Sequence, residues 1–163
     1  MKVQFQCFPA TLPPPDIVSA VVGVFARHEA RISTRKLDKG LTSDQVLGVV
    51  RDDLIEVGFD VEAGKRADEK IHRPVFFGKN GVPSLKYEID AYHEAQRCGL
   101  EIEAGRAWMG NAVYRNLVQA MVMVQVELLI LAVPLSYKYK SGGKMMSSSD
   151  FDNTVAVASA LYG

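Results

Sequence analysis

The chain has few of the features that mark secreted or membrane-bound proteins. Only two cysteines, Cys7 and Cys98, occur in 163 residues. This number is too small for a disulfide framework, so we expect a reducing, cytoplasmic location. The longest apolar run, Leu128–Val133, is far too short to span a bilayer, and the first residues lack the apolar core of a signal peptide. We therefore expect no membrane partner.

An excess of charge of either sign is also absent. Lysine and arginine total 19, aspartate and glutamate total 19, and the formal net charge is zero. No field of the whole molecule therefore attracts nucleic acid, although a basic groove opposite an acidic site is compatible with this balance. Hydrophobic residues make up 48% of the chain, enough to bury one core. We predict a single domain over residues 1–163.

Hydrophobic periodicity predicts an α/β protein. Apolar residues recur at helical spacing in four segments, Ile17–Ile32, Ser43–Val57, Asn111–Met123 and Asp150–Leu161. Strand patterns occur in six others, Val3–Phe8, Phe59–Ala63, Pro74–Gly78, Val82–Tyr92, Gly99–Gly105 and Val126–Val133. The last strand is continuously apolar, which is typical of burial on both faces. The predicted helix Asn111–Met123 lies between the acidic strand Gly99–Gly105 and this apolar strand. This order implies a right-handed crossover and a mixed sheet between helix layers. Tyr137–Met146 is predicted as a loop.

Two of these strands carry an unusual number of acids. Alternation places Glu88, Asp90 and Tyr92 on one face of Leu85–Tyr92, and Glu101 and Glu103 on one face of the following strand. If the strands pair, four carboxylates converge. Such a cluster is unfavourable unless a cation binds or protons are retained.

The residue types favour a hard divalent cation. Mg²⁺ takes a few carboxylate oxygens and keeps several waters, so an open acidic face suits it. Zinc is disfavoured because the three histidines, His28, His72 and His93, have no metal-ligand spacing with one another or with either cysteine.

Glu88-Ile89-Asp90, followed by Glu101-Ile102-Glu103, resembles the PD-(D/E)xK nuclease motif in its Glu-x-Glu variant. This variant resembles restriction endonucleases of the BamHI and BglII type, with Glu103 in the place of the usual lysine. The expected order of elements from Glu56 to Val133 resembles that of the family core as well. The resemblance implies a restriction-endonuclease-like fold, a mixed β-sheet flanked by helices on both faces.

The resemblance also implies roles for single residues. Asp90 and Glu101 are expected to ligate Mg²⁺, helped by the carbonyl of Ile102, and Mn²⁺ is expected to substitute. Glu103 would orient or deprotonate the attacking water. Glu56 resembles the additional helical acid of the family, with Asp53 as the competing candidate. The implied activity is that of a magnesium-dependent deoxyribonuclease, an endonuclease hydrolysing phosphodiester bonds of double-stranded DNA as a homodimer, so that two sites cut two strands.

Basic and amide side chains near the acidic strand and in the later loop are expected to hold the DNA backbone. These candidates are Arg106, Asn111, Arg115, Lys138, Lys140 and Lys144.

Other interpretations remain open at this point. Glu101 and Glu103 also suit the solvated face of an edge strand, and Lys86 is a candidate to replace the missing motif lysine. The alternative function is a non-catalytic DNA- or protein-binding member of the same fold. A glycoside hydrolase with paired carboxylates is a more distant third.

Overall fold

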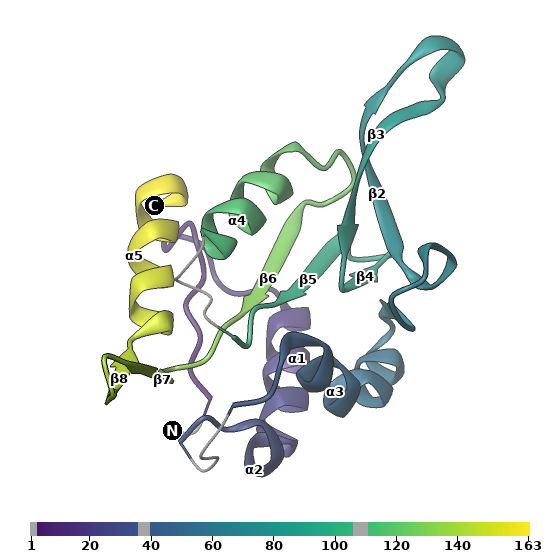
Figure 1. Cartoon of the computed structure of the whole chain (residues 1–163). Helices are drawn as coiled ribbons and strands as arrows, with labels where there is room; N and C mark the ends of the chain where they lie inside the picture. Colours follow the sequence, from purple (N-terminus) through teal and green to yellow (C-terminus); the bar gives the residue numbers. More distant parts are fainter. Residues whose placement is uncertain (1–2, 36–39, 106–110) are drawn as a thin grey trace.

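The computed structural model describes residues 3–35, 40–105 and 111–163 and has a mixed sheet between helices (Figure 1). The sheet has the strand order β1 (Asp60–Val61), β4 (Ala91–His93), β5 (Cys98–Ile102) and β6 (Leu128–Ala132). β4 pairs antiparallel with both β1 and β5, whereas β5 and β6 are parallel. Helix α4 (Ala112–Val122) makes the crossover that two parallel strands require. The predicted α/β class is confirmed.

Helices cover both faces of this sheet. On one face, α1 (Asp16–Arg27) and α3 (Ser43–Val57) bury their apolar stripes against Leu100 and Ile102 of β5. On the other face, α4 and α5 (Asp150–Tyr162) pack together against the opposite side of β6. None of the described helices is long and apolar enough to cross a membrane.

Local signals in the sequence explain where the helix before the sheet begins and ends. Thr42 accepts a hydrogen bond from the backbone of Gln45, whose side chain accepts one from the backbone of Thr42. This capping box opens α3, and Gly58, with a φ of 111°, closes it. The first predicted helix is interrupted at His28, after which the short α2 (Glu29–Ile32) follows.

A long hairpin projects from the body of the molecule (Figure 1). Its strands, β2 (Ile71–Phe77) and β3 (Pro83–Ile89), pair only with each other and are joined by the turn η2 (Lys79–Gly81). The φ angles of Asn80 and Gly81 are 59° and 73°, the left-handed values that this residue pair adopts readily. The hairpin predicted from Asn-Gly is therefore confirmed. A short 3₁₀ turn, η1 (Ala67–Glu69), precedes it.

Three further predicted elements differ from the structure. Residues 3–8 are not a strand: Phe5 is exposed despite the alternation, and the consecutive Cys7 and Phe8 pack against two different clusters. The predicted loop Tyr137–Met146 instead contains the hairpin β7 (Tyr137–Ser141) and β8 (Lys144–Ser148), turned by two glycines. β6 is an edge strand of its sheet and only half-buried, since an apolar cavity of about 720 Å³ lies along it.

Candidate active site

Asp90 lies at a break in the predicted acidic strand. β3 ends at Ile89 and β4 begins at Ala91, with a bend at Asp90 between them. The break shifts the alternation, so Tyr92 is buried in the core instead of sharing the face of Asp90, and its hydroxyl donates to the carbonyl of Gln125. The placement of Tyr92 on the acidic face was therefore wrong.

The side chain of Asp90 closes the end of the neighbouring strand. Its Oδ2 accepts a hydrogen bond from the backbone N–H of Ile102 at 2.7 Å. The ladder between β4 and β5 runs only from His93–Cys98 to Ala91–Leu100, so the N–H of Ile102 lies beyond it. The carboxylate thus takes the place of a ladder carbonyl and is held beside β5.

Glu101 is the second acid of the site and the most strongly perturbed. Burial, followed by the negative charges of Asp90 and Glu103, raises its pKa to about 9, against a smaller opposing effect of Arg115. Burial also raises the pKa of Asp90 to about 6, opposed by the bond from Ile102, with further increases from Glu62 and Glu103 and a decrease from Lys70. Asp90 and Glu101 are therefore neighbouring acids in a dry environment, where ionising both is unfavourable.

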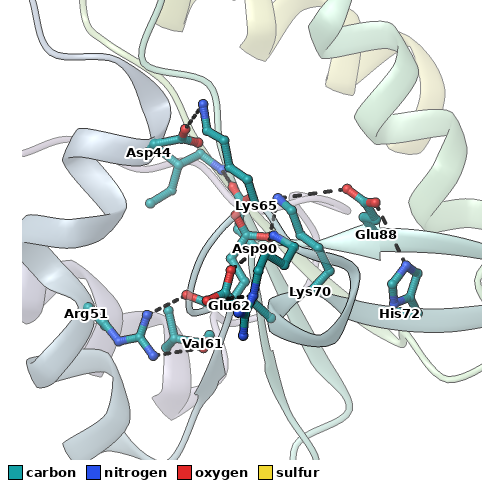
Figure 2. Close-up of polar contacts among 12 residues, drawn as sticks. Asp44, Arg51, Val61, Glu62, Lys65, Lys70, His72, Glu88 and Asp90 are labelled. Carbon is teal, nitrogen blue, oxygen red and sulfur yellow. Dashed lines mark hydrogen bonds and ion pairs between the residues drawn. The ribbon is translucent and has the colours of Figure 1, made fainter.

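Glu62 is an acid of this site that the sequence analysis did not select. It follows β1, is only 7% exposed, and its backbone N–H donates to the carbonyl of Asp90 at 2.9 Å. Its Oε2 accepts a hydrogen bond from Nζ of Lys70 at 2.8 Å (Figure 2). Arg51 fixes the same turn from α3 by donating to the carbonyl of Glu62 at 2.6 Å. The sequence feature that could have pointed to Glu62 is its position as an acidic residue inside the predicted strand Phe59–Ala63.

Glu103 is held by two donors from α4. Its Oε1 accepts from Nδ2 of the buried Asn116 at 2.8 Å and from Arg115 at 3.1 Å. Arg115, expected to contact DNA, therefore forms an ion pair with a site acid. Across the described ranges 3–35, 40–105 and 111–163, no three histidine, cysteine, aspartate or glutamate side chains are arranged to hold one metal ion.

The helical acids are placed differently from the site pair. Glu56 is exposed in the last turn of α3, and Asp53 forms an ion pair with Arg27 at 2.8 Å and lies at hydrogen-bond distance, 3.2 Å, from Nε2 of His28. The structure puts Glu62, rather than either of them, beside Asp90. Glu88 is exposed and lies 3.9 Å from Lys70.

Besides Arg115, five residues were expected to contact DNA. Arg106 lies outside the described residues. Asn111 is exposed and precedes α4 with a left-handed φ of 61°. Lys138, Lys140 and Lys144 are exposed on the β7–β8 hairpin, which follows the carboxyl end of β6. Since β5 and β6 are parallel, this is also the end at which Glu101 and Glu103 lie.

Comparison with protein-family models, curated proteins and solved structures finds no match to this chain. The chemistry of the site is therefore argued from its own side chains.

The donor chemistry at Asp90 and Glu101 suits Mg²⁺. This ion is commonly held by one or two carboxylates while keeping several waters, so a pair of acids is sufficient. Burial is the largest cause of both raised pKa values, and a bound divalent cation would offset both this cost and the smaller repulsion from neighbouring acids. Asp90 and Glu101 thus have the donor chemistry expected of magnesium ligands. Glu103 instead accepts a hydrogen bond from Arg115, and Glu62 accepts one from Lys70.

Proposed function

We propose that this protein is a magnesium-dependent endonuclease that hydrolyses DNA phosphodiester bonds, with a restriction-endonuclease-like fold. The observation that carries the proposal is the pair Asp90 and Glu101. Both carboxyls are largely removed from water, which raises both pKa values; the charge of Asp90 raises that of Glu101 further, and Glu62 and Glu103 add to both. A domain rarely keeps such a pair in its interior for stability alone, and perturbed acids of this kind are typical of functional sites.

The roles follow from the position of each side chain. Asp90 and Glu101 hold Mg²⁺ at the carboxyl end of β5, with the carbonyl of Ile102 as a further ligand. When bound, this ion activates water and stabilises the negative charge of a phosphoryl transition state. Glu103, two residues after Glu101, orients the attacking water or accepts its proton. Lys70 balances the charge of Glu62 behind the pair.

The order of elements supports the same proposal. α3, β1, β4, β5, α4 and β6 occur in this order along the chain, with the β2–β3 hairpin inserted between β1 and β4. Asp90 directly precedes β4 and Glu101 lies in β5, and the order of helix, acidic strands, helix and strand is the one that the resemblance implies for the family core. Mn²⁺ is expected to replace Mg²⁺. A homodimer with double-stranded DNA as substrate would bring one site to each strand.

The test is cleavage of plasmid DNA with Mg²⁺ or Mn²⁺ by the wild type and by Asp90→Asn and Glu101→Gln. These substitutions preserve shape and remove charge. We expect each to lower the rate at least about 100-fold. Glu88→Gln is the matched control, since Glu88 is an exposed acid at the edge of the site, and it should cleave at close to the wild-type rate. Equal rates in the wild type and both site variants would contradict the proposal.

A non-catalytic DNA-binding protein on this fold is the second candidate. The ion pair between Glu103 and Arg115 favours it, because an acid engaged by a guanidinium and by Asn116 is less available to a water molecule. Binding of duplex DNA without cleavage by the wild type, under every metal condition, would decide for this alternative.

A further inference from the structure

The hairpin of β2 and β3 has a firmly packed base. Arg73 stacks over the ring of Tyr92, 3.8 Å from its centroid, and donates to the side chain of Gln125 at 2.9 Å. Val75 is buried in one cluster with Tyr92, and the carbonyl of Pro74 accepts from the N–H of Val124 at 3.1 Å. The hairpin therefore leaves the body of the protein in a fixed direction (Figure 1).

The outer part of this hairpin carries large apolar side chains in water. Phe76 is 62% exposed, Phe77 is 53% exposed and Val82 is 62% exposed. Register shifts on both sides of Phe76 interrupt the alternation, so two consecutive phenylalanines are exposed. A two-stranded ribbon gains little stability from such side chains, which makes a binding partner the better explanation.

The charges of the same segment indicate what kind of partner fits. Between Pro74 and Tyr87 the sequence contains Lys79 and Lys86 and neither aspartate nor glutamate. Both lysines are exposed. A symmetric contact between two copies of the hairpin would place these lysines near one another without an acid of the segment to compensate. A polyanion avoids this repulsion.

The hairpin also leads directly into the proposed active site. β3 ends at Ile89, and the next residue is Asp90. A nucleic acid that reaches the Asp90–Glu101 pair therefore passes the base of the hairpin. A two-stranded ribbon has the right width for the major groove, where lysines reach phosphates and phenyl rings contact thymine methyl groups.

We propose that the β2–β3 hairpin is an arm that enters the major groove of double-stranded DNA, with Phe76 and Phe77 against base edges and Lys79 and Lys86 on phosphates. The inference rests on the proposed function for its substrate. It adds the element that reads the DNA, which none of the residues selected from the sequence supplies.

Binding of a fluorescein-labelled duplex, measured by anisotropy in EDTA, tests the arm separately from cleavage. We expect Phe76→Ser/Phe77→Ser to raise Kd at least tenfold. Lys79→Ala/Lys86→Ala should raise Kd about three- to tenfold and reduce its dependence on salt. Ile55→Ser and Arg31→Ala change exposed residues on α3 and α2 and should leave Kd unchanged.

Three outcomes would overturn the inference. The first is that both double variants of the arm bind duplex DNA with the Kd of the wild type. The second is that the wild type itself does not bind duplex DNA. The third is a change from dimer to monomer in sedimentation with Kd unchanged, which would make the arm a self-association surface. Binding through the arm without any cleavage would defeat the nuclease proposal alone. If the arm variants still cleave DNA and their Kd is unchanged, the proposal of a DNA-binding arm is contradicted and the nuclease proposal stands.

Discussion

The carboxylate of Asp90 and the backbone N–H of Ile102 are joined by a hydrogen bond of 2.7 Å. This bond fixes the acid beside β5 at the point where the ladder with β4 has ended. Glu101, the second acid of the pair, immediately precedes Ile102, whose N–H donates this hydrogen bond. The strand end and the acidic pair are therefore one unit, and a change that moves the end of β5 also moves the proposed magnesium ligands.

The free energy of unfolding should fall as pH rises from about 5 to about 9. The folded-state pKa values of Asp90 and Glu101, about 6 and about 9, lie above the unfolded values of about 4. The folded state therefore retains protons that the unfolded chain releases. The contribution of both groups is complete below about pH 4 and is lost as pH passes through each folded-state pKa. Calorimetry without divalent ions at pH 5, 7 and 9 measures this trend.

Glu101→Gln should be more stable than the wild type at pH 8, by about 1–3 kcal/mol, because the amide has no charge to desolvate. At pH 4 the difference should nearly vanish, since Glu101 is then protonated. Glu88→Gln, at an exposed acid, serves as the control and should show little difference at either pH. A Glu101→Gln variant less stable than the wild type at pH 8 would contradict the unfavourable burial of this acid.

Mg²⁺ should raise the Tm of the wild type. With the ion at about ten times its Kd, mass action adds about 1.4 kcal/mol, which corresponds to about 3–6 °C for a domain of this size. Asp90→Asn and Glu101→Gln should lose most of this rise, and the wild type should lose it at pH 5, where protons compete for both acids. Differential scanning fluorimetry with and without Mg²⁺ measures these changes in Tm. An equal rise in both variants would place the ion elsewhere.

The ion pair between Lys70 and Glu62 should matter for stability. Lys70→Met leaves the buried carboxylate of Glu62 without its nearest cation, so we expect a loss of about 2–3 kcal/mol in urea unfolding. The double variant Lys70→Met/Glu62→Gln should recover most of the loss. Lys65→Met removes an exposed ion pair with Asp44 and should change stability by less than about 0.5 kcal/mol. A double variant no better than Lys70→Met would show that the ion pair is not the cause.

Much of the fold could be predicted because its signals are local. The capping box and Gly58 define α3, and Asn80-Gly81 defines the long hairpin. The errors occur where tertiary contacts override local pattern. Residues 3–8 alternate as a strand would, but Cys7 and Phe8 pack against two clusters and the segment is not a strand. Gly142-Gly143 turns a hairpin within a stretch whose polar composition is typical of a loop.

The site was predictable only in part. Asp90 and Glu101 follow from alternation on two paired strands, although the break at Asp90 was not visible in the sequence. Glu62 and Lys70 could not be selected, because their position beside Asp90 depends on the pairing of β1 with β4. The predicted strand patterns do not give the order of the strands in the sheet, so they do not specify which acids become neighbours.

Glu103 provides the last test of the proposed chemistry. Glu103→Gln keeps an oxygen that can accept from Asn116 and Arg115, and it removes only the negative charge. If Glu103 orients the attacking water or accepts its proton, kcat should fall about 100-fold or more while the Tm rise with Mg²⁺ persists. Arg115→Met frees the carboxylate and should change kcat far less. A Glu103→Gln variant with wild-type kcat would assign this acid to the ion pair with Arg115 alone.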